Sequence, residues 1–315
     1  MTACGVVGAG AIGRGAVASL VRAGFPVTVY DLDADAAAQA ASAGAACAGS
    51  LAELAQASEV VLLALPDTPE IVAALDGGLE EGLRRGSTVI VTSTVSPDTP
   101  VELERRLAPA GVDVLDAPVS GGPVKAASGD LAMMVGGPDA VFERRRPVLE
   151  ALASHLVHVG PTGHGELAKL VNNLMGAVII LGISEGLALA AKAGVDVRRV
   201  CEAVSGGSGS SWILREWIPD TAFRGDYERR FSLDLMSKDM GLIAGLAADL
   251  EVPVAALELA AATFRSAIDA GYGSHDFSVV AALQARAAGT ELPGGPPPTP
   301  SEAPSSLTET QHDRC

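Results

Sequence analysis

The strongest constraint on the fold is a glycine-rich loop between a short apolar run and a helical pattern near the start of the chain. Residues 4–7 read as a strand, and Gly8, Gly10 and Gly13 follow at the spacing GxGxxG. A helical pattern and a second strand come next, and that strand ends in Asp31. In this context the motif predicts a dinucleotide-binding unit. Gly8 makes the tight turn, Gly10 admits a pyrophosphate and Gly13 lets helix and strand pack closely.

The same unit predicts which dinucleotide is bound. The phosphates would lie on backbone N–H groups at the start of the helix. Asp31 would accept hydrogen bonds from ribose hydroxyls, and its charge, with Asp33 nearby, would repel a 2′-phosphate, so we predict NAD in preference to NADP. Alternatively, Asp31 only caps the next helix, from Ala34 onward. The predicted cofactor residues in this part of the chain are Gly8, Gly10, Ala11, Ile12, Gly13 and Asp31, together with Leu65 and Pro66 at the end of a later strand.

Strand and helix patterns alternate up to residue 160, which predicts an α/β fold with a Rossmann-type, doubly wound, mainly parallel sheet. Further strands are expected at residues 45–47, 59–65, 88–92, 112–115, 131–136 and 155–159. Ligands bind beyond the carboxyl ends of such strands. Two loops lie there: Ser93-Thr94 offers hydroxyls, and Ser120-Gly121-Gly122 offers a hydroxyl and backbone N–H groups that suit a carboxylate. Ordinary turn chemistry is the alternative for both loops.

A long helix is predicted from about residue 164 to 193, with apolar residues on every face, so we expect it to be buried nearly all round. Lys169 and Asn173 are four residues apart and therefore share one face of it. One interpretation is that the stem of Lys169 packs while its amine reaches water at a helix end. The other is that Lys169 faces a cleft and exchanges a proton near neutral pH, because desolvation disfavours its charged form.

After residue 160 the patterns are helical only, and they predict an all-helical C-terminal domain joined to the sheet by the long helix. We expect further helices at residues 197–204, 210–218, 232–249, 254–270 and 277–287. The pair Lys238-Asp239 lies within one of them and could be an internal surface pair. From residue 290 the chain is rich in proline and glycine, which predicts a disordered tail. The predicted domains are residues 1–162, 163–289 and 290–315.

Composition excludes several classes of partner. The net charge is −16 and the pI about 4.7, which argues against a nucleic-acid or anionic-membrane partner. The four cysteines are scattered, which indicates reduced thiols, and the five histidines have no metal-ligand spacing, so no metal site is expected. No leader pattern and no apolar run of membrane length is evident, so we expect a soluble, cytoplasmic protein.

Four motifs in order resemble the 3-hydroxyacid (β-hydroxyacid) dehydrogenase family, whose members include 3-hydroxyisobutyrate and threonate-type dehydrogenases. They are the glycine loop, DAPVSGGPVKAASG at residues 116–129, GHGELAKLVNN at residues 163–173 and FSLDLMSKDMGLI at residues 231–243. The resemblance covers residues 4–287. It implies a dinucleotide-binding domain, an all-helical domain, and dimers or tetramers built through the helical domain.

The resemblance also implies roles for individual residues. Lys169 matches the catalytic lysine, which takes the hydroxyl proton in oxidation and returns it in reduction. Asn173 matches the residue that holds the substrate, and Ser120, Gly121 and Gly122 match the loop that binds its carboxylate. Thr94 matches a loop residue beside the nicotinamide and substrate. Lys238 matches a lysine near both cofactor and substrate.

The resemblance leaves the substrate open. Segments such as AGYGSHDFS favour a four-carbon sugar acid of the threonate type, followed by 3-hydroxyisobutyrate or tartronate semialdehyde. Lys125 in the substrate loop either helps to bind such an anion or is simply solvated. Two other functions are considered: an imine reductase of the same architecture, against which Lys169 counts, and a non-catalytic dinucleotide-binding module, against which the intact lysine and SGG loop count.

Overall fold

The computed structural model describes residues 2–228, 230–298 and 300. By the contacts within the chain it consists of two units, Met1–Asn172 and Asn173–Cys315, here called the sheet unit and the helical unit. The division falls inside helix α9 (His164–Lys192) rather than just before it. The predicted domain boundary after residue 162 stays a prediction.

The sheet unit contains one mainly parallel sheet with the strand order β3-β2-β1-β4-β5-β6-β8-β7, and β9 pairs with β8. Strands β1 to β6 run parallel, whereas β8 is antiparallel to β6 and β7. The doubly wound prediction is therefore confirmed; the short strand β7 was not predicted. The strands are β1 (Cys4–Val7), β2 (Val27–Tyr30), β3 (Ala46–Cys47), β4 (Val60–Leu63), β5 (Thr88–Val91), β6 (Asp113–Asp116), β7 (Val119–Ser120), β8 (Leu131–Gly136) and β9 (Ala153–Gly160).

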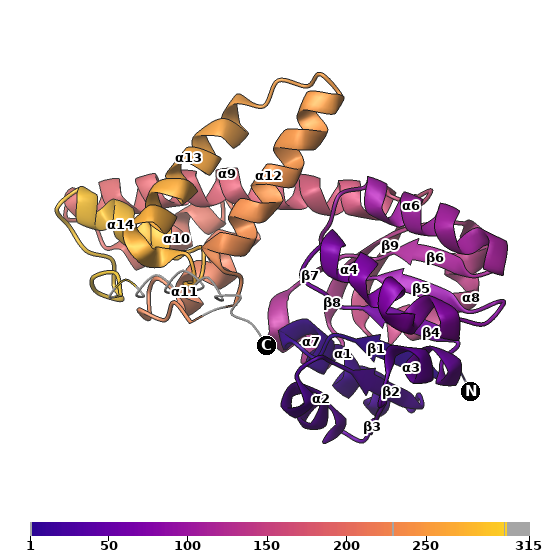
Figure 1. The fold of residues 1–315 in the computed structure, drawn as a ribbon. Coiled ribbons are helices and arrows are strands. Elements are labelled where there is room, and N and C mark those ends of the chain that lie inside the picture. Colours follow the sequence, from indigo (N-terminus) through magenta and orange to yellow (C-terminus); the bar gives the residue numbers. More distant parts are fainter. Residues whose placement is uncertain (1, 229, 299, 301–315) are drawn as a thin grey trace, which may run out of the picture. The chain divides into compact units, whose positions relative to one another are not determined.

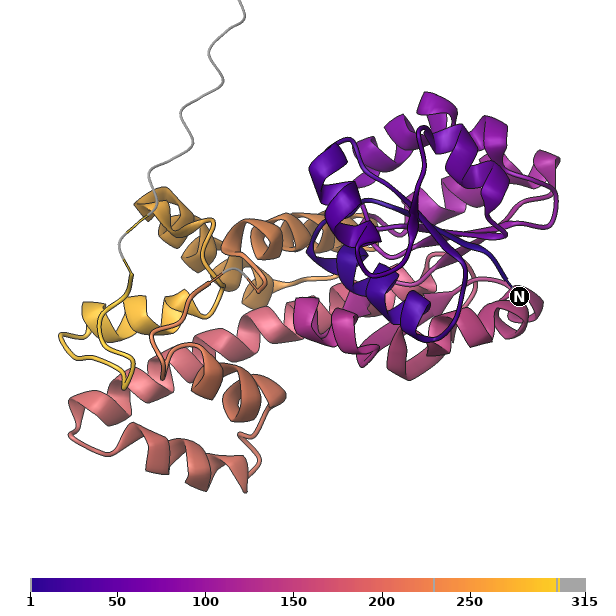
Figure 2. The same ribbon diagram turned by 90° about the horizontal axis from the view of Figure 1, so that it is seen from below.

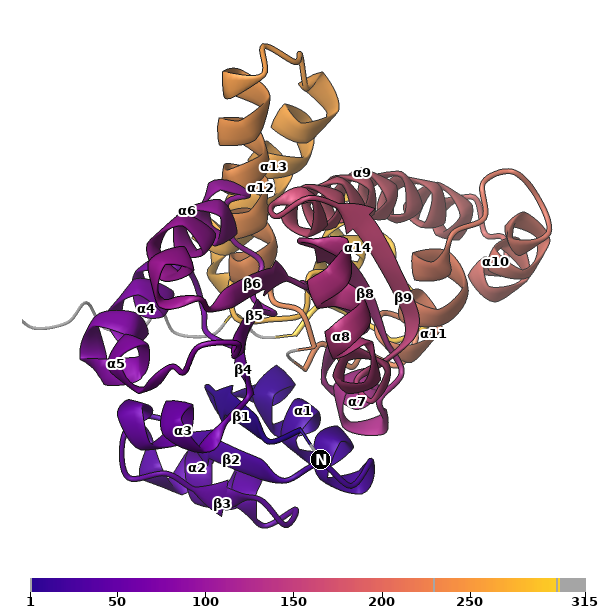
Figure 3. The same cartoon turned by 90° about the vertical axis from the view of Figure 1, so that its right-hand side faces the viewer.

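Helices cover both faces of this sheet, as the end-on view in Figure 3 shows. The central strands are apolar at successive positions, so each strand feeds two cores: Val6 and Leu62 belong to one, Val7 and Leu63 to the other. The first core is covered by α1 (Ala11–Arg22), α2 (Ala34–Ala41), α7 (Gly122–Ser128) and α8 (Asp139–Glu150). The second is covered by α3 (Leu51–Ala57), α4 (Thr68–Ala74), the π-helical turn η1 (Leu75–Leu79) and α6 (Asp98–Leu107).

The helical unit holds the remainder of α9 and the helices that follow it (Figures 1 and 2). Their bounds agree with the sequence patterns to within a few residues: α10 (Val197–Ser205), η3 (Ile213–Trp217), α11 (Ile218–Asp220), α12 (Leu233–Asp249), α13 (Ala255–Ala267), η4 (Ile268–Tyr272) and α14 (Val279–Ala287). The α12 and α13 helices form the orange hairpin of Figure 1.

The buried carboxylate of Asp276 connects several segments of the helical unit by hydrogen bonds. Asp276 is fully buried and accepts hydrogen bonds from Trp217 Nε1 (2.9 Å), Ser278 Oγ (2.6 Å) and the Phe231 N–H (3.1 Å). Burial raises the pKa of Asp276 above its ordinary value, and these hydrogen bonds oppose the rise. The carboxylate thereby joins η3, the segment before α12 and the start of α14.

The proline- and glycine-rich segment predicted as a tail begins with packed residues. Leu292 is 4% exposed. A Cβ atom on Gly294 would lie 2.3 Å from the Ala222 carbonyl oxygen and 2.3 Å from the Gly225 nitrogen, so the segment lies directly against the chain before α12. Residues 301–315 of the predicted tail lie outside the described residues.

The long helix α9 is not buried nearly all round, contrary to our expectation. Leu167, Val171, Met175, Val178 and Leu189 are 38%, 48%, 58%, 37% and 72% exposed. Only 28% of its most apolar 18-residue window is buried, and by length and composition α9 could cross a membrane, a property that core helices of soluble proteins share. Apolar periodicity identifies the helix, but one of its faces is left uncovered by this chain.

Candidate active site

The glycine loop between β1 and α1 has the backbone that a dinucleotide requires. Gly8 has a φ of +96°, and a Cβ atom there would lie 2.4 Å from the Ala64 carbonyl oxygen. A Cβ atom on Gly13 would lie 1.8 Å from the Gly8 carbonyl oxygen, so α1 approaches the loop as closely as glycine allows. By contrast, a Cβ atom on Gly10 would meet nothing within 4 Å. The backbone is therefore open at Gly10, at the helix start, where the diphosphate of a dinucleotide would lie.

Asp31 lies at the end of β2 and contacts this loop directly. Its Oδ2 accepts a hydrogen bond of 2.6 Å from the Ala9 N–H, and its Oδ1 accepts one of 2.9 Å from the Asp33 N–H. The cap of α2 is Asp33, whose side chain accepts from the Asp35 and Ala36 N–H groups. The alternative that Asp31 only caps the next helix is therefore wrong. Asp31 instead places a carboxylate beside the glycine loop.

The loops that follow β4 and β5 are tied together by Ser93. Its Oγ accepts a hydrogen bond of 3.0 Å from the Leu65 N–H and donates one of 2.6 Å to the Leu65 carbonyl oxygen. Since Ser93 is 8% exposed, its hydroxyl serves structure rather than a ligand. In the same two loops, Thr94 is partly buried and Pro66, next to Leu65, is exposed, so both remain accessible; their role at the cofactor stays a prediction.

The predicted carboxylate loop occupies the short connection from β7 to α7. Ser120 ends β7, Gly121 has a φ of +131°, and Gly122, with a φ of +74°, begins α7. Both glycines therefore hold left-handed conformations that other residues rarely adopt. All three residues are partly exposed, so their polar groups are accessible. Lys125, in α7, forms an ion pair of 3.3 Å with Asp130 at the surface.

Lys169 is 6% exposed and lies in the second turn of α9. The start of this helix is fixed by Asp116, a fully buried residue at the end of β6. Asp116 Oδ1 accepts a hydrogen bond of 2.8 Å from the Gly163 N–H, and Oδ2 accepts one of 2.9 Å from the Glu166 N–H. Burial raises the pKa of Asp116, which these backbone hydrogen bonds oppose. Asp116 thus caps the helix that carries Lys169.

A second buried carboxylate joins this helix to the loop after β5. Glu166 is fully buried, and its Oε2 accepts a hydrogen bond of 3.1 Å from the Val95 N–H. Asp116 and Glu166 together link three segments that carry predicted site residues: the loop with Thr94, the strand that leads to Ser120, and the helix with Lys169. We assigned no role to either acid from the sequence. The sequence signal that could have identified Asp116 and Glu166 is the position of each acidic residue next to an apolar run.

Two further predicted residues lie in the helical unit and meet at one acidic side chain. Asn173, in α9, is 4% exposed and donates from Nδ2 to Asp239 Oδ2 over 2.6 Å. Lys238 Nζ lies 3.4 Å from Asp239 Oδ1. Asp239 is 1% exposed, so the interpretation of Lys238-Asp239 as a surface pair is wrong for the aspartate. Asn173 and Lys238 therefore both contact Asp239, a residue to which the sequence assigned no role at the site; their roles toward a substrate stay predictions.

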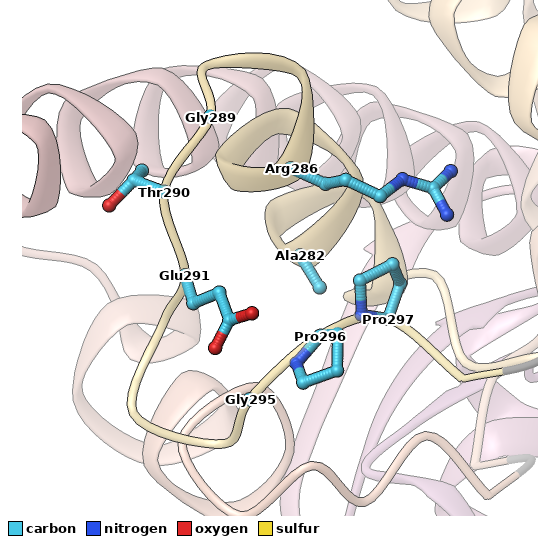
Figure 4. A pocket seen from close by; sticks show the side chains of 8 residues that line it. All are labelled: Ala282, Arg286, Gly289, Thr290, Glu291, Gly295, Pro296 and Pro297. Carbon is cyan, nitrogen blue, oxygen red and sulfur yellow. The ribbon is translucent and has the colours of Figure 1, made fainter.

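Two cavities of the helical unit are lined by other residues. One, of about 410 Å³, lies between α12 and α13. The other, of about 240 Å³, lies between the end of α14 and the segment after it, where Arg286 and Glu291 are the charged side chains (Figure 4). Within the described residues, no group of three or more His, Cys, Asp or Glu side chains could hold a metal ion.

Known proteins match this chain along most of its length. Residues 3–160 match the NAD binding domain of 6-phosphogluconate dehydrogenase, and residues 163–284 match the NAD-binding region of NADP-dependent 3-hydroxyisobutyrate dehydrogenase. The L-threonate dehydrogenase of Escherichia coli O6:H1 is 36% identical over 294 residues, which cover 92% of this chain and 96% of that protein. A Mycobacterium tuberculosis 3-hydroxyisobutyrate dehydrogenase, solved with L-serine, has a TM-score of 0.83 at 32% identity and covers 90% of this chain and 99% of its own.

By these findings the protein is a two-domain, NAD-binding oxidoreductase with a Rossmann-type sheet and a helical C-terminal region. More narrowly, the chain belongs to the 3-hydroxyisobutyrate dehydrogenase-like family of 3-hydroxyacid dehydrogenases, which act on hydroxyl donors. An imine reductase from Pseudomonas has a TM-score of 0.61 at 22% identity and covers 90% of this chain and 99% of its own, and therefore shares the fold alone. The interpretation as a non-catalytic module is not supported.

Proposed function

We propose that this protein transfers a hydride between NAD and the hydroxyl-bearing carbon of a small 3-hydroxy acid, with Lys169 as the general acid/base. The observation that carries the proposal is a buried lysine in α9, whose helix start is fixed by Asp116 from the strand leading to the carboxylate loop. A four-carbon sugar acid such as threonate is our preferred substrate, because a relative at 36% identity is named L-threonate dehydrogenase. 3-Hydroxyisobutyrate and tartronate semialdehyde are next.

Each part of the site has a role in this proposal. Bound NAD supplies the hydride acceptor in oxidation. Ser120 and the N–H groups of Gly121 and Gly122 bind the substrate carboxylate, and Asn173 and Lys238 hold the rest of the substrate. Lys169 takes the hydroxyl proton in oxidation and returns it in reduction. Leu65, Pro66 and Thr94 line the cofactor, with Lys238 near both molecules.

The test is a substrate panel. NADH formation is followed with L-threonate, 3-hydroxyisobutyrate, glycerate and L-serine at equal concentrations. We expect one acid to be oxidised far better than the others, with L-threonate first. If none is oxidised although NADH binds, the proposal is wrong.

Cofactor choice is predicted to depend on Asp31. Replacing it with serine removes the negative charge beside the glycine loop, so the preference for NAD over NADP should fall by about tenfold or more. Dissociation constants of both cofactors measured by fluorescence titration would show this. Asp33→Ser is the matched control, since serine still caps α2 and the ratio should change less. Equal ratios in wild type and Asp31→Ser would contradict the assignment.

We also propose that the protein works as a homodimer or homotetramer in the cytoplasm. The exposed apolar residues of α9 recur at helical spacing and form a stripe about 33 Å long from Leu167 to Leu189. Apolar stripes of this size on soluble proteins are commonly interfaces, and a second copy of α9 would match this one.

The oligomer is tested by placing charge in the stripe. Met175→Lys combined with Val178→Lys should convert the assembly to monomers by light scattering, because buried unpaired lysines are strongly unfavourable. Val101→Lys, at an exposed position in α6, is the control and should not change the mass. An unchanged mass in the double variant would place the interface elsewhere.

A further inference from the structure

One buried carboxylate contacts two of the residues that we propose bind the substrate. Asp239 belongs to α12, whose neighbouring buried residues Met236, Met240 and Ile243 are apolar. Its two oxygens face different partners: Oδ2 accepts from Asn173 Nδ2 over 2.6 Å, and Oδ1 lies 3.4 Å from Lys238 Nζ. A buried charge in an apolar helix is destabilising unless it is paired, so this arrangement needs a reason beyond packing.

The contact fixes the orientation of the Asn173 amide. The oxygen and nitrogen of an asparagine side chain have nearly the same shape, so the amide can present either a donor or an acceptor on a given side. An ionised carboxylate only accepts hydrogen bonds. The nitrogen of Asn173 must therefore face Asp239, and the amide oxygen must lie on the side away from it. Both residues are at least nine-tenths buried, which limits exchange of this bond with water.

The same carboxylate restrains Lys238. A lysine side chain is flexible, and an ordered ammonium loses considerable conformational entropy. The side chain of Lys238 is 24% exposed and that of Asp239 is 2% exposed, so the ammonium is partly accessible while its anchor is not. Asp239 therefore keeps a positive charge close to Asn173 without contacting solvent itself.

We propose that Asp239 is a positioning residue for substrate binding: it holds the Asn173 amide in one orientation and anchors the Lys238 ammonium beside it. This inference rests on the proposed function, in which Asn173 and Lys238 hold the substrate. It adds a residue that acts through both of them.

The test compares the variants Asp239→Asn and Asp239→Glu. Their kinetics are measured with two substrates: L-threonate, and the acid of the panel that the wild-type protein oxidises best. Asparagine keeps the size but loses the obligatory acceptor, so the Asn173 amide can turn over. We expect KM for the acid to rise about tenfold, with kcat less affected and the NADH dissociation constant within about twofold of wild type. Glutamate keeps the carboxylate and should raise KM less than asparagine does. Asp249→Asn, at the exposed end of the same helix, is the matched control and should leave KM unchanged.

Melting temperatures separate positioning from folding. If the contact only stabilises the fold, one of two results is expected. Either KM is unchanged in both folded variants, or KM rises in proportion to the loss of melting temperature whether or not a carboxylate is present. Each of these results overturns the inference. If Asp239→Asn fails to fold, Asp239→Glu is compared with wild type and with Asn173→Ala. A KM for Asp239→Glu equal to that of wild type supports the inference. A KM as high as that of Asn173→Ala overturns it. Wild-type protein that oxidises no acid overturns the proposed function, a failure visible before any variant is made.

Discussion

Replacing Lys169 with alanine is expected to lower kcat by about two to four orders of magnitude, the usual contribution of a general acid/base. The hydroxyl proton has to leave as the hydride departs, and without an acceptor at this position the alkoxide charge develops unrelieved. Lys169 lies in α9, beyond the glycine loop and Asp31 in sequence, and no predicted cofactor contact involves it. The NADH dissociation constant should therefore stay within about twofold of wild type. Steady-state kinetics and fluorescence titration measure the two quantities.

Two further variants show whether the loss comes from proton transfer. Lys169→Arg keeps a positive charge but cannot release a proton near neutral pH, so it should be nearly as inactive as the alanine variant. Lys192→Ala removes a lysine at the exposed end of the same helix and should retain full activity. Substantial turnover by Lys169→Ala, or by Lys169→Arg, would remove Lys169 from proton transfer.

Much of the fold was predictable because parallel strands buried on both faces are short continuous apolar runs. The run at residues 4–7 is β1 without change, and the pattern at residues 88–92 differs from β5 by one residue. Strand β7 was missed, since it has two residues and is defined by its pairing with β8, which no local pattern reveals. The expected burial of α9 was wrong for a related reason. Periodicity identifies apolar faces, but it does not show whether the same chain covers them.

The candidate site was predictable where chemistry and local spacing coincide. The glycine loop, Asp31 and Lys169 stand out in the sequence for this reason. Asp116, Glu166 and Asp239 do not, because their partners are far away in sequence: Asp116 bonds to Gly163, and Asp239 to Asn173, 66 positions earlier. For Ser93 the sequence left two interpretations open, a hydroxyl for a ligand and ordinary turn chemistry. The structure favours the second, because the Ser93 hydroxyl joins two loops of the sheet unit.

The Gly13→Ala variant should unfold more readily than wild type by about 3 kcal/mol or more, beyond the usual range for overpacking. Its Cβ atom would lie 1.8 Å from the Gly8 carbonyl oxygen, which is backbone and cannot rotate away as a side chain could. Either α1 or the loop must move. Because we propose that the same loop binds the cofactor, NADH affinity should fall together with stability. Denaturant unfolding followed by circular dichroism, with and without NADH, measures both effects.

The Gly10→Ala variant should separate the two effects that Gly13→Ala combines. A Cβ atom on Gly10 meets no protein atom within 4 Å, and Gly10 has a φ of −64°, which alanine adopts easily. The free energy of unfolding without cofactor should therefore stay within about 1 kcal/mol of wild type, because the poorer capping by alanine is offset in part by the lower conformational entropy of the unfolded chain. The added methyl group instead occupies the open side of the loop, where the backbone admits the diphosphate, so NADH affinity should fall about tenfold or more. A stable Gly10→Ala variant with wild-type affinity would show that the diphosphate lies elsewhere. Loss of stability equal to that of Gly13→Ala would show instead that Gly10 serves the fold. Only loss of affinity with retained stability identifies the loop as the cofactor site and assigns its two glycines different physical roles.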